Sequence, residues 1–309
     1  MRSAQRLGEL GENRSATLPR TPKPPARAGG MIQRMPLSSQ QHGPVRFDFH
    51  RPTSLPNVSV LRITSERHLS CSVPAGFSSV FHLAGRSEWA MRSARWTSAP
   101  GTVGVKIPGE VYTERARDGI AQFQVVKFDD ALIEDARAAL DLRLGAPKDN
   151  AIDGSDPRVR PLVALHRRLL DDETSAALEQ DLCDAISAFL ELTSVDGGAC
   201  VPTTASSAVA RARAMLDARI TETVTLDELA AHARLDKYRL CRAFRDEVGL
   251  PPHAYVTHRR ISFAQTLLAR GLSQAEVAAS VGLYDQSQLH RHFKRIVGVT
   301  PGAYAHAVR

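Results

Sequence analysis

A repeat with a period of 49 residues constrains the C-terminal third of this 309-residue chain more than any other feature. Eight positions match between the two copies: Leu240, Arg242, Phe244, Val248, Gly249, Pro252, Ala254 and Tyr255 match Leu289, Arg291, Phe293, Val297, Gly298, Pro301, Ala303 and Tyr304. Leu229-Ala230 also matches Val277-Ala278, with an offset of 48 that indicates one added residue in a turn. Because self-similarity at a fixed spacing is typical of repeated units, we predict two copies of one supersecondary module.

Each copy carries the signals of a helix, a tight turn and a second helix. The capping and terminating residues follow the same order in both: Thr225, Glu228, Asp236 and Gly249, then Ser273, Glu276, Asp285 and Gly298. Ser or Thr followed three residues later by Glu predicts a capping box, Asp caps the next helix, and Gly ends it. This is the anatomy of a helix-turn-helix unit, which places its second helix in the major groove of DNA. Two ordinary helical hairpins are the alternative, which the duplicated caps and the basic face disfavour.

A single helix is expected between the two units, from Ala254 to Arg270, with Gly271 ending it. At about 1.5 Å per residue, such a helix spans about 24 Å. Together with the bodies of the units, this length would bring the two second helices to major-groove segments about 34 Å apart. One chain would then bind a long, non-palindromic site.

The second helices carry side chains suited to base recognition and to phosphate binding. Arg donates two hydrogen bonds to guanine and Gln pairs with the adenine edge, whereas contacts to phosphate add affinity without sequence information. The residues expected to contact bases are Tyr238, Cys241, Arg242, Gln286, Ser287, His290 and Arg291. The residues expected to contact phosphates are Lys237, Arg239, Arg245, Arg259, Arg260, Lys294 and Arg295. A solvated helix face is the alternative for each of them.

The charge balance of the chain agrees with a polyanionic partner. The net charge is +7, and residues 206–309 carry 15 Lys and Arg against 9 Asp and Glu. The four cysteines lie far apart with no CxxC pair, which disfavours a zinc site or a disulfide framework and favours a cytoplasmic protein. No apolar stretch approaches the roughly 20 residues of a membrane span. The basic, proline-rich N-terminus does not have the pattern of a secretory signal.

The first part of the chain divides into an extension and a β-rich region. Residues 1–30 are rich in proline and poor in large apolar residues, which predicts a disordered extension and makes Met31 an alternative start to Met1. Between residues 44 and 128, short runs rich in β-branched residues alternate with Pro-Gly and Asp-Gly pairs, including Asp118-Gly119. Such spacing predicts an antiparallel barrel or sandwich with turns at these pairs.

Amphipathic helices are expected after the strands. Apolar residues at helical spacing predict helices over residues 131–142, 157–170 and 173–192, which would cover the open side of the barrel, form a dimer contact, or both. A stretch of small residues then predicts a linker. The expected fold class is α+β, with an all-α C-terminal domain. The expected domains are the extension at 1–30, a β-rich domain with trailing helices at 31–192, a linker at 193–207 and a DNA-binding domain at 208–309.

The C-terminal residues resemble the DNA-binding domain of the AraC/XylS family of bacterial regulators. The resemblance rests on three segments: TLDELAAHARLDKYRLCRAFRDEVGLPPHAYV, the joining helix HRRISFAQTLLARG, and SQAEVAASVGLYDQSQLHRHFKRIVGVTPGAY. It covers about 100 residues, and the last segment matches the most specific signature of the family. It implies the same base-contacting residues as the chemistry above. One departure is Arg234 in the first turn, where the family often has Gly.

The N-terminal half resembles, more loosely, the cupin-like effector or dimerisation domain that many such regulators carry. The segment APGTVGVKIPGEVYTERARDG contains a strand, a Pro-Gly turn and another strand. Metal-binding cupins place His residues soon after such a turn, whereas Tyr112 stands here and no His or Glu cluster follows, so we expect neither a metal nor another cofactor. The resemblance implies a barrel interior that holds a small organic effector. The residues expected to line it are Phe81, His82, Trp89, Trp96 and Tyr112.

The leading hypothesis is a sequence-specific transcription regulator without enzymatic activity. It would bind promoter DNA, respond to a small-molecule effector, and recruit or block RNA polymerase. A second hypothesis is a cupin-type enzyme fused to a DNA-binding tail, which the lack of HExxH, GxSxG, P-loop and GxGxxG patterns disfavours. A third hypothesis, which the sequence leaves open, is a constitutive regulator whose N-terminal domain only forms a homodimer.

Overall fold

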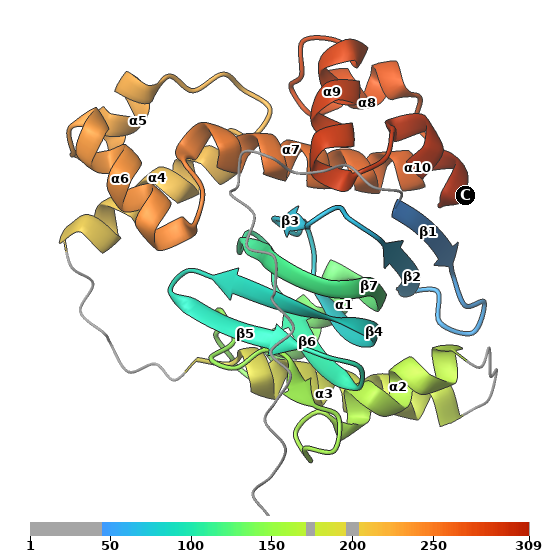
Figure 1. Cartoon of the computed structure of the whole chain (residues 1–309). Helices are drawn as coiled ribbons and strands as arrows, with labels where there is room; N and C mark the ends of the chain where they lie inside the picture. Colours follow the sequence, from blue (N-terminus) through green and yellow to red (C-terminus); the bar gives the residue numbers. More distant parts are fainter. Residues whose placement is uncertain (1–44, 171–176, 196–203, 309) are drawn as a thin grey trace, which may run out of the picture. The chain divides into compact units, whose positions relative to one another are not determined.

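The computed structural model describes residues 45–170, 177–195 and 204–308. The predicted extension over residues 1–30 and the alternative start at Met31 lie outside these residues. Within the described ranges, no helix combines the length and the apolar character that a bilayer crossing requires. A β-rich half is followed by helices (Figure 1), so the expected α+β fold class is confirmed.

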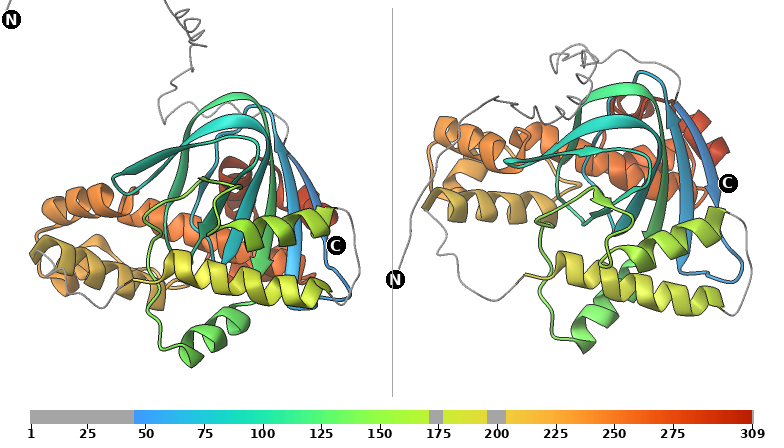
Figure 2. Two further views of the ribbon diagram at one scale, coloured as in Figure 1. Left: turned by 90° about the horizontal axis from the view of Figure 1, so that it is seen from below. Right: turned by 60° about the horizontal axis from the view of Figure 1, so that its bottom comes forward.

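Strands of the N-terminal half form one antiparallel sheet, which is strongly curved in Figure 2. Its order is β1-β2-β7-β4-β6-β8, with β3 paired to β7 and β5 paired to β4. The described strands therefore form an open path from β1 to β8 rather than a closed ring. Their bounds are β1 (Val45–His50), β2 (Val58–Ser65), β3 (Cys71–Ser72), β4 (Ser78–Met91), β5 (Ala94–Ser98), β6 (Thr102–Lys106), β7 (Tyr112–Phe128) and β8 (Ile152–Asp153).

The long strands β4 and β7 form the centre of the sheet. The expected turn at Asp118-Gly119 is wrong, because these residues lie inside β7 and the strand continues past them. The register between β4 and β7 shifts on both sides of Ala84, and Gly85 has a left-handed φ of 79°. A side chain at Gly85 would meet the backbone oxygen of Ile120 at 2.6 Å. Glycine thus lets the two strands stay paired across a bulge instead of separating at a turn.

The face of the sheet that carries Val103, Val105 and Val126 packs against three helices. Side chains alternate along a strand, so these residues share one face, and they form a buried core with Leu162 and Phe189 of the helices. Covering the sheet is one of the two roles predicted for these helices. Their bounds are α1 (Asp130–Ala139), α2 (Arg160–Leu170) and α3 (Ala177–Thr193).

The described C-terminal part consists of helices α4 to α10. The two predicted units correspond to α5–α6 and α8–α9, which lie at opposite ends of α7 (Figure 1). The predicted connecting helix is confirmed as α7. Helix α4 has no counterpart among the predicted helices and begins inside the predicted linker, of which residues 196–203 are not described. The bounds are α4 (Thr204–Ala218), α5 (Leu226–Ala233), α6 (Lys237–Val248), α7 (Pro252–Ala269), α8 (Gln274–Ser280), α9 (Gln286–Val297) and α10 (Pro301–Ala307).

The opposite face of the sheet packs against these C-terminal helices. Leu61 and Val125 share a buried core with α7, α8, α9 and α10. Near β3, Val73 and Val111 share a second core with α4, α5, α6 and α7. The sheet therefore lies between the α1–α3 layer and the helices of both helix-turn-helix units, and its second face is where a cavity forms.

Candidate nucleic-acid interface and interior cavity

The local geometry of both helix-turn-helix units confirms the predicted caps. Thr225 and Ser273 each accept a hydrogen bond from the backbone N–H of the Glu three residues later, and that Glu accepts one from the cap backbone. Asp236 accepts hydrogen bonds from two backbone N–H groups at the start of α6, and Asp285 accepts one at the start of α9. Because each cap satisfies N–H groups that a helix start leaves unpaired, both units have defined starts.

The second helices α6 and α9 are held by one apolar face each. Both end at a glycine with left-handed φ, at 94° for Gly249 and 91° for Gly298. The remaining faces of these two helices point away from the packed core. The buried residues occupy equivalent positions in the repeat: Leu240, Phe244 and Val248 in α6, and Leu289, Phe293 and Val297 in α9.

Most side chains predicted to contact bases are exposed on these outer faces. Arg242 and Arg291, which are equivalent in the repeat, are both exposed, whereas Cys241 is half-buried. Gln286 is exposed and donates a hydrogen bond of 3.3 Å to the side-chain oxygen of Gln274. The other exposed residues of this set are Tyr238, Ser287 and His290. Base contact by these residues stays a prediction, and the exposed face is the geometry that it needs.

The residues predicted to contact phosphate fall into two groups. Arg259 donates to Asp217 at 3.1 Å and to the carbonyl of Pro74 at 2.7 Å. Arg260 donates to the carbonyl oxygens of Ile220, Gly282 and Glu222. These bonds give both guanidinium groups a structural role inside the protein. The exposed members of the set are Lys237, Arg239, Arg245, Lys294 and Arg295.

Tyr284 is a candidate contact that the sequence predictions do not include. Its side chain is 94% exposed, and that of Tyr238 is 80% exposed, whereas Tyr112, Tyr255 and Tyr304 are buried. Tyr284 is the residue added in the second turn, immediately before the cap of α9. The offset between the two copies changes from 48 to 49 in this turn, which shows in the sequence that one residue is added there. Tyr238 lies in the first turn of α6 and Tyr284 lies just before α9, so each exposed tyrosine is next to the start of the second helix of its unit.

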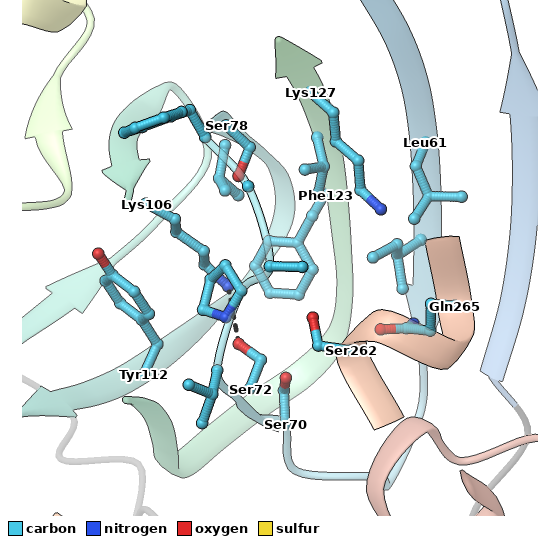
Figure 3. Close-up of a pocket in the computed structure, with 18 of the residues that line it drawn as sticks. Leu61, Ser70, Ser72, Ser78, Lys106, Tyr112, Phe123, Lys127, Ser262 and Gln265 are labelled. Carbon is cyan, nitrogen blue, oxygen red and sulfur yellow. Dashed lines mark hydrogen bonds between the residues drawn. The ribbon is translucent and has the colours of Figure 1, made fainter. Parts of the chain in front are cut away.

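A cavity of about 760 Å³ lies between the second face of the sheet and α7 (Figure 3). Ser262 and Gln265 of α7 face residues of β2, β4, β6 and β7 across it. Of the residues predicted to line a barrel interior, His82, Trp89, Trp96 and Tyr112 line this cavity. Phe81 does not: it packs in the core on the other face of the sheet, because it is adjacent to His82 along β4.

Two lysines that were not predicted, Lys106 and Lys127, also line the cavity. Both are register partners of Ser78, one in β6 and one in β7, so all three side chains share one face of the sheet. Adjacent strands are about 4.8 Å apart, which places the two lysine backbones about 10 Å apart. In both strands each lysine follows a core valine, so the sequence places the lysine on the opposite face of the sheet from the core. That this face lines a cavity is known only from the structure.

The ammonium groups of Lys106 and Lys127 are desolvated. Burial lowers the pKa of Lys106 to about 8, and burial also lowers the pKa of Lys127. The Lys106 ammonium donates to the hydroxyl of Ser72 at 3.3 Å and lies 5.2 Å from the ring centre of Tyr112. Within the described part of the chain, neither lysine forms an ion pair. The charge of Glu114 acts on Lys106, but its carboxylate forms an ion pair with Arg117, at 2.6 Å. The cavity thus has a positive pole and an apolar wall.

The described residues contain no cluster of three or more His, Cys, Asp or Glu side chains that would hold a metal ion. Several cavity residues carry ligating side chains, among them His68, His258 and Asp217, and His82 donates through Nε2 to the carbonyl of Ala84 at 2.7 Å. The chemistry that this cavity offers is therefore that of hydrogen-bonding groups, charged side chains of both signs and aromatic surfaces.

Two capped helix-turn-helix units joined by one helix and preceded by a curved antiparallel sheet define a two-domain helix-turn-helix protein. Residues 229–307 match the family model described as a helix-turn-helix domain. MtrA of Neisseria gonorrhoeae, an HTH-type transcriptional regulator, is 39% identical over 80 residues, which are 26% of this chain and 27% of MtrA. A putative AraC-like transcription regulator of Streptomyces antibioticus is 37% identical over 81 residues, 26% of this chain and 27% of that protein. The C-terminal part of the chain is an AraC-type helix-turn-helix domain, matched over about a quarter of these relatives' length.

The two-domain arrangement is also found in a solved structure. ToxT of Vibrio cholerae, in its apo K231A form, superposes with a TM-score of 0.52 at 13% identity. The superposition covers 82% of this chain and 98% of ToxT. This likeness concerns the fold, and it extends over the β-rich half, which the sequence relatives do not cover.

Proposed function

We propose that this protein is a sequence-specific transcription regulator that binds DNA through both helix-turn-helix units and binds an anionic effector in its cavity. The observation that carries the DNA-binding part is the pair of equivalent, exposed arginines, Arg242 and Arg291, on the outer faces of α6 and α9. An arginine at this place on a recognition helix reads guanine through two hydrogen bonds. The MtrA and AraC-like relatives, which are named as transcription regulators, support the same function.

A footprint on a duplex selected from a random pool tests the DNA-binding proposal. Protection of two successive major-groove segments is expected, because α7 separates the two units. Arg291→Ala or Arg242→Ala is expected to weaken specific binding about 10-fold or more, and nonspecific binding much less. Arg115→Ala is the matched control, since it removes an exposed arginine from the sheet. Equal losses for all three variants would contradict base recognition by α6 and α9.

The effector part of the proposal rests on Lys106 and Lys127. Two desolvated lysines on adjacent register positions, neither of which forms an ion pair within the described residues, favour an anion between them. Aromatic side chains such as Trp89 and Phe123 line the rest of the cavity and suit an apolar body. ToxT has been solved bound to (E)-4-(8-methylnaphthalen-1-yl)but-3-enoic acid, which has this combination of aromatic rings and an acid group. We therefore propose an aromatic or aliphatic acid as the class of effector.

Two probes that differ by one charged group test the effector class. 8-Anilinonaphthalene-1-sulfonate carries a sulfonate that N-phenyl-1-naphthylamine lacks, and both become fluorescent in apolar surroundings. Lys127→Met or Lys106→Met is expected to weaken binding of the sulfonate about 10-fold and to leave the neutral probe within about twofold, since only the anion needs the cations. Equal effects on both probes would show that the lysines do not select an anion. Homodimer formation and contact with RNA polymerase are further parts of the proposal, tested by sedimentation and by transcription in vitro.

A further inference from the structure

The turn between β6 and β7 lies between the cavity and the first helix-turn-helix unit. Its first and last residues, Lys106 and Tyr112, line the cavity, and Figure 3 shows both side chains there. The Tyr112 hydroxyl oxygen accepts a hydrogen bond of 3.1 Å from the N–H of Ile107, which ties the two ends of the turn together. The Lys106 ammonium packs over the Tyr112 ring. A ligand that moved either side chain would therefore move the turn.

The tip of the same turn is bonded to the helical half. Glu110 is 4% exposed and accepts a hydrogen bond of 2.9 Å from Arg213 of α4. It also accepts two, of 2.7 and 3.0 Å, from Arg92 in the turn between β4 and β5. Burial alone would raise the pKa of Glu110, but the hydrogen bonds and charges of Arg92 and Arg213 lower it below its ordinary value. The carboxylate is therefore ionised and holds both arginines.

A second set of bonds runs from the turn to α7. The N–H of Gly109 donates to the carbonyl of Pro74 at 3.0 Å, and the same carbonyl accepts from Arg259 of α7 at 2.7 Å. Arg259 and the Tyr255 hydroxyl both donate to Asp217 of α4. The turn thus contacts the two helices that support α5 and α6, and α7 is also the helix that separates the two DNA-binding units.

We propose that the turn from Lys106 to Tyr112 couples ligand binding in the cavity to DNA binding, through the ion pair between buried Glu110 and half-buried Arg213. This inference rests on the proposed function and adds to it the route by which the cavity acts on the helices. Losing one partner of a buried ion pair leaves an uncompensated charge, so the pair holds the turn and α4 in one arrangement. A ligand that shifts Lys106 or Tyr112 changes the position of Glu110, and with it α4 and α7. Thermodynamic reciprocity requires that DNA alter the affinity of the ligand by the same factor.

The test measures coupling with 8-anilinonaphthalene-1-sulfonate as the probe. In the wild-type protein, saturating probe is expected to change the dissociation constant for the selected duplex at least about fivefold. Arg213→Gln and Glu110→Gln are expected to reduce this factor to less than about twofold. Arg92→Gln is the matched control, because it removes the other partner of Glu110 without touching α4, and it is expected to keep the wild-type factor. Absence of coupling in the wild type, or retention of coupling in Arg213→Gln, would overturn the proposal.

Two further measurements separate loss of coupling from loss of structure. Each variant is expected to bind the probe alone, and the duplex alone, within about twofold of the wild type, since the ion pair contacts neither. Arg213→Lys keeps the cation and is expected to restore coupling, and its failure to do so counts against an ion pair as the link. If the wild type bound neither probe nor duplex, the proposed function itself would fail. If it bound both without coupling, only the inference about the turn would fail.

Discussion

Arg234 and Gly282 occupy the same position in the two helix-turn-helix turns, and both have a left-handed backbone, with φ of 57° and 72°. Arg234 ends α5 with its N–H donating to the carbonyls of Ala230 and Ala231. A left-handed conformation costs a residue with a Cβ about 1 kcal/mol, a cost that glycine does not have. The first unit therefore carries backbone strain that the second avoids.

Replacing Arg234 with Gly is expected to stabilise the protein. The substitution removes the strain at φ of 57°, and we expect the free energy of unfolding to rise by about 1 kcal/mol. Urea unfolding followed by circular dichroism measures the change. An unchanged or lower midpoint would mean that the Arg234 side chain contributes more than its backbone costs.

Any side chain at Gly282, the equivalent position in the second turn, is expected to lower the stability of the protein strongly. A Cβ at Gly282 would lie 2.1 Å from the backbone oxygen of Thr221, so Gly282→Ala adds a steric clash to the strain. Gly271→Ala is the control, because Gly271 is also left-handed, yet its Cβ would meet no described atom within 4 Å. We expect Gly271→Ala to lower the free energy of unfolding by about 1 kcal/mol and Gly282→Ala by several times more. Similar losses for both variants would exclude the clash.

Tyr284 is expected to contribute to DNA binding although it lies outside the recognition helix. An exposed phenol beside the start of α9 is placed to donate a hydrogen bond to a phosphate oxygen. Tyr284→Ala and Tyr284→Phe are both expected to weaken DNA binding about fivefold, corresponding to one net hydrogen bond of about 1 kcal/mol. Leu140→Ala, at an exposed apolar residue beside α1, is the control. Wild-type affinity in both tyrosine variants would rule the contact out.

Lys127→Met is expected to change stability and ligand binding in opposite directions. Desolvation of the Lys127 ammonium lowers its pKa, and Met replaces it with an apolar side chain of similar length. Without a ligand, the free energy of unfolding is expected to rise by about 1 kcal/mol. Thermal unfolding in the absence and presence of 8-anilinonaphthalene-1-sulfonate tests this, since the sulfonate is expected to stabilise the wild type more than the variant. A variant that is less stable without the probe would indicate a structural role for Lys127.

The stability of the protein is expected to fall as the pH is lowered from about 6.5 to about 4. Burial, reinforced by the charges of Arg295 and His292, lowers the pKa of His258 to about 4, and its neutral ring donates to the carbonyl of Cys71 at 3.1 Å. The unfolded chain binds a proton near pH 6.5 and the folded chain does not, so each pH unit in this window costs up to about 1.4 kcal/mol.

His258→Gln is expected to make this pH dependence shallower, because it removes the group that titrates only in the unfolded chain. Measurements of the free energy of unfolding between pH 4 and pH 8 give the slope. His166, whose pKa burial lowers to about 3, contributes a similar slope in the wild type and in the variant. A slope that does not change on substitution would assign the acid sensitivity to groups other than His258.

The features of the helix-turn-helix domain that follow from local sequence could be predicted. Caps such as Thr225 and Asp236, and the buried face of Leu240 and Phe244, depend on residues within about four positions of each other. Because the repeat contains these caps and buried faces twice, each copy supports the prediction made from the other. Local pattern was insufficient where a side chain has distant partners: Arg259 and Arg260 have the spacing of exposed helix residues, yet both bond backbone carbonyls far away in the chain.

The chain's order of residues by itself determined where the helices of the two helix-turn-helix units start and stop, and that α6 and α9 expose Arg242 and Arg291, because these features depend on spacing along one element. Only the tertiary structure decided that Lys106 and Lys127 flank Ser78, and that Glu110 meets Arg213. These pairs are separated by 21 residues and by 103 residues along the chain. Strand pairing and helix docking bring them together, and neither is encoded in the pattern around any one of them.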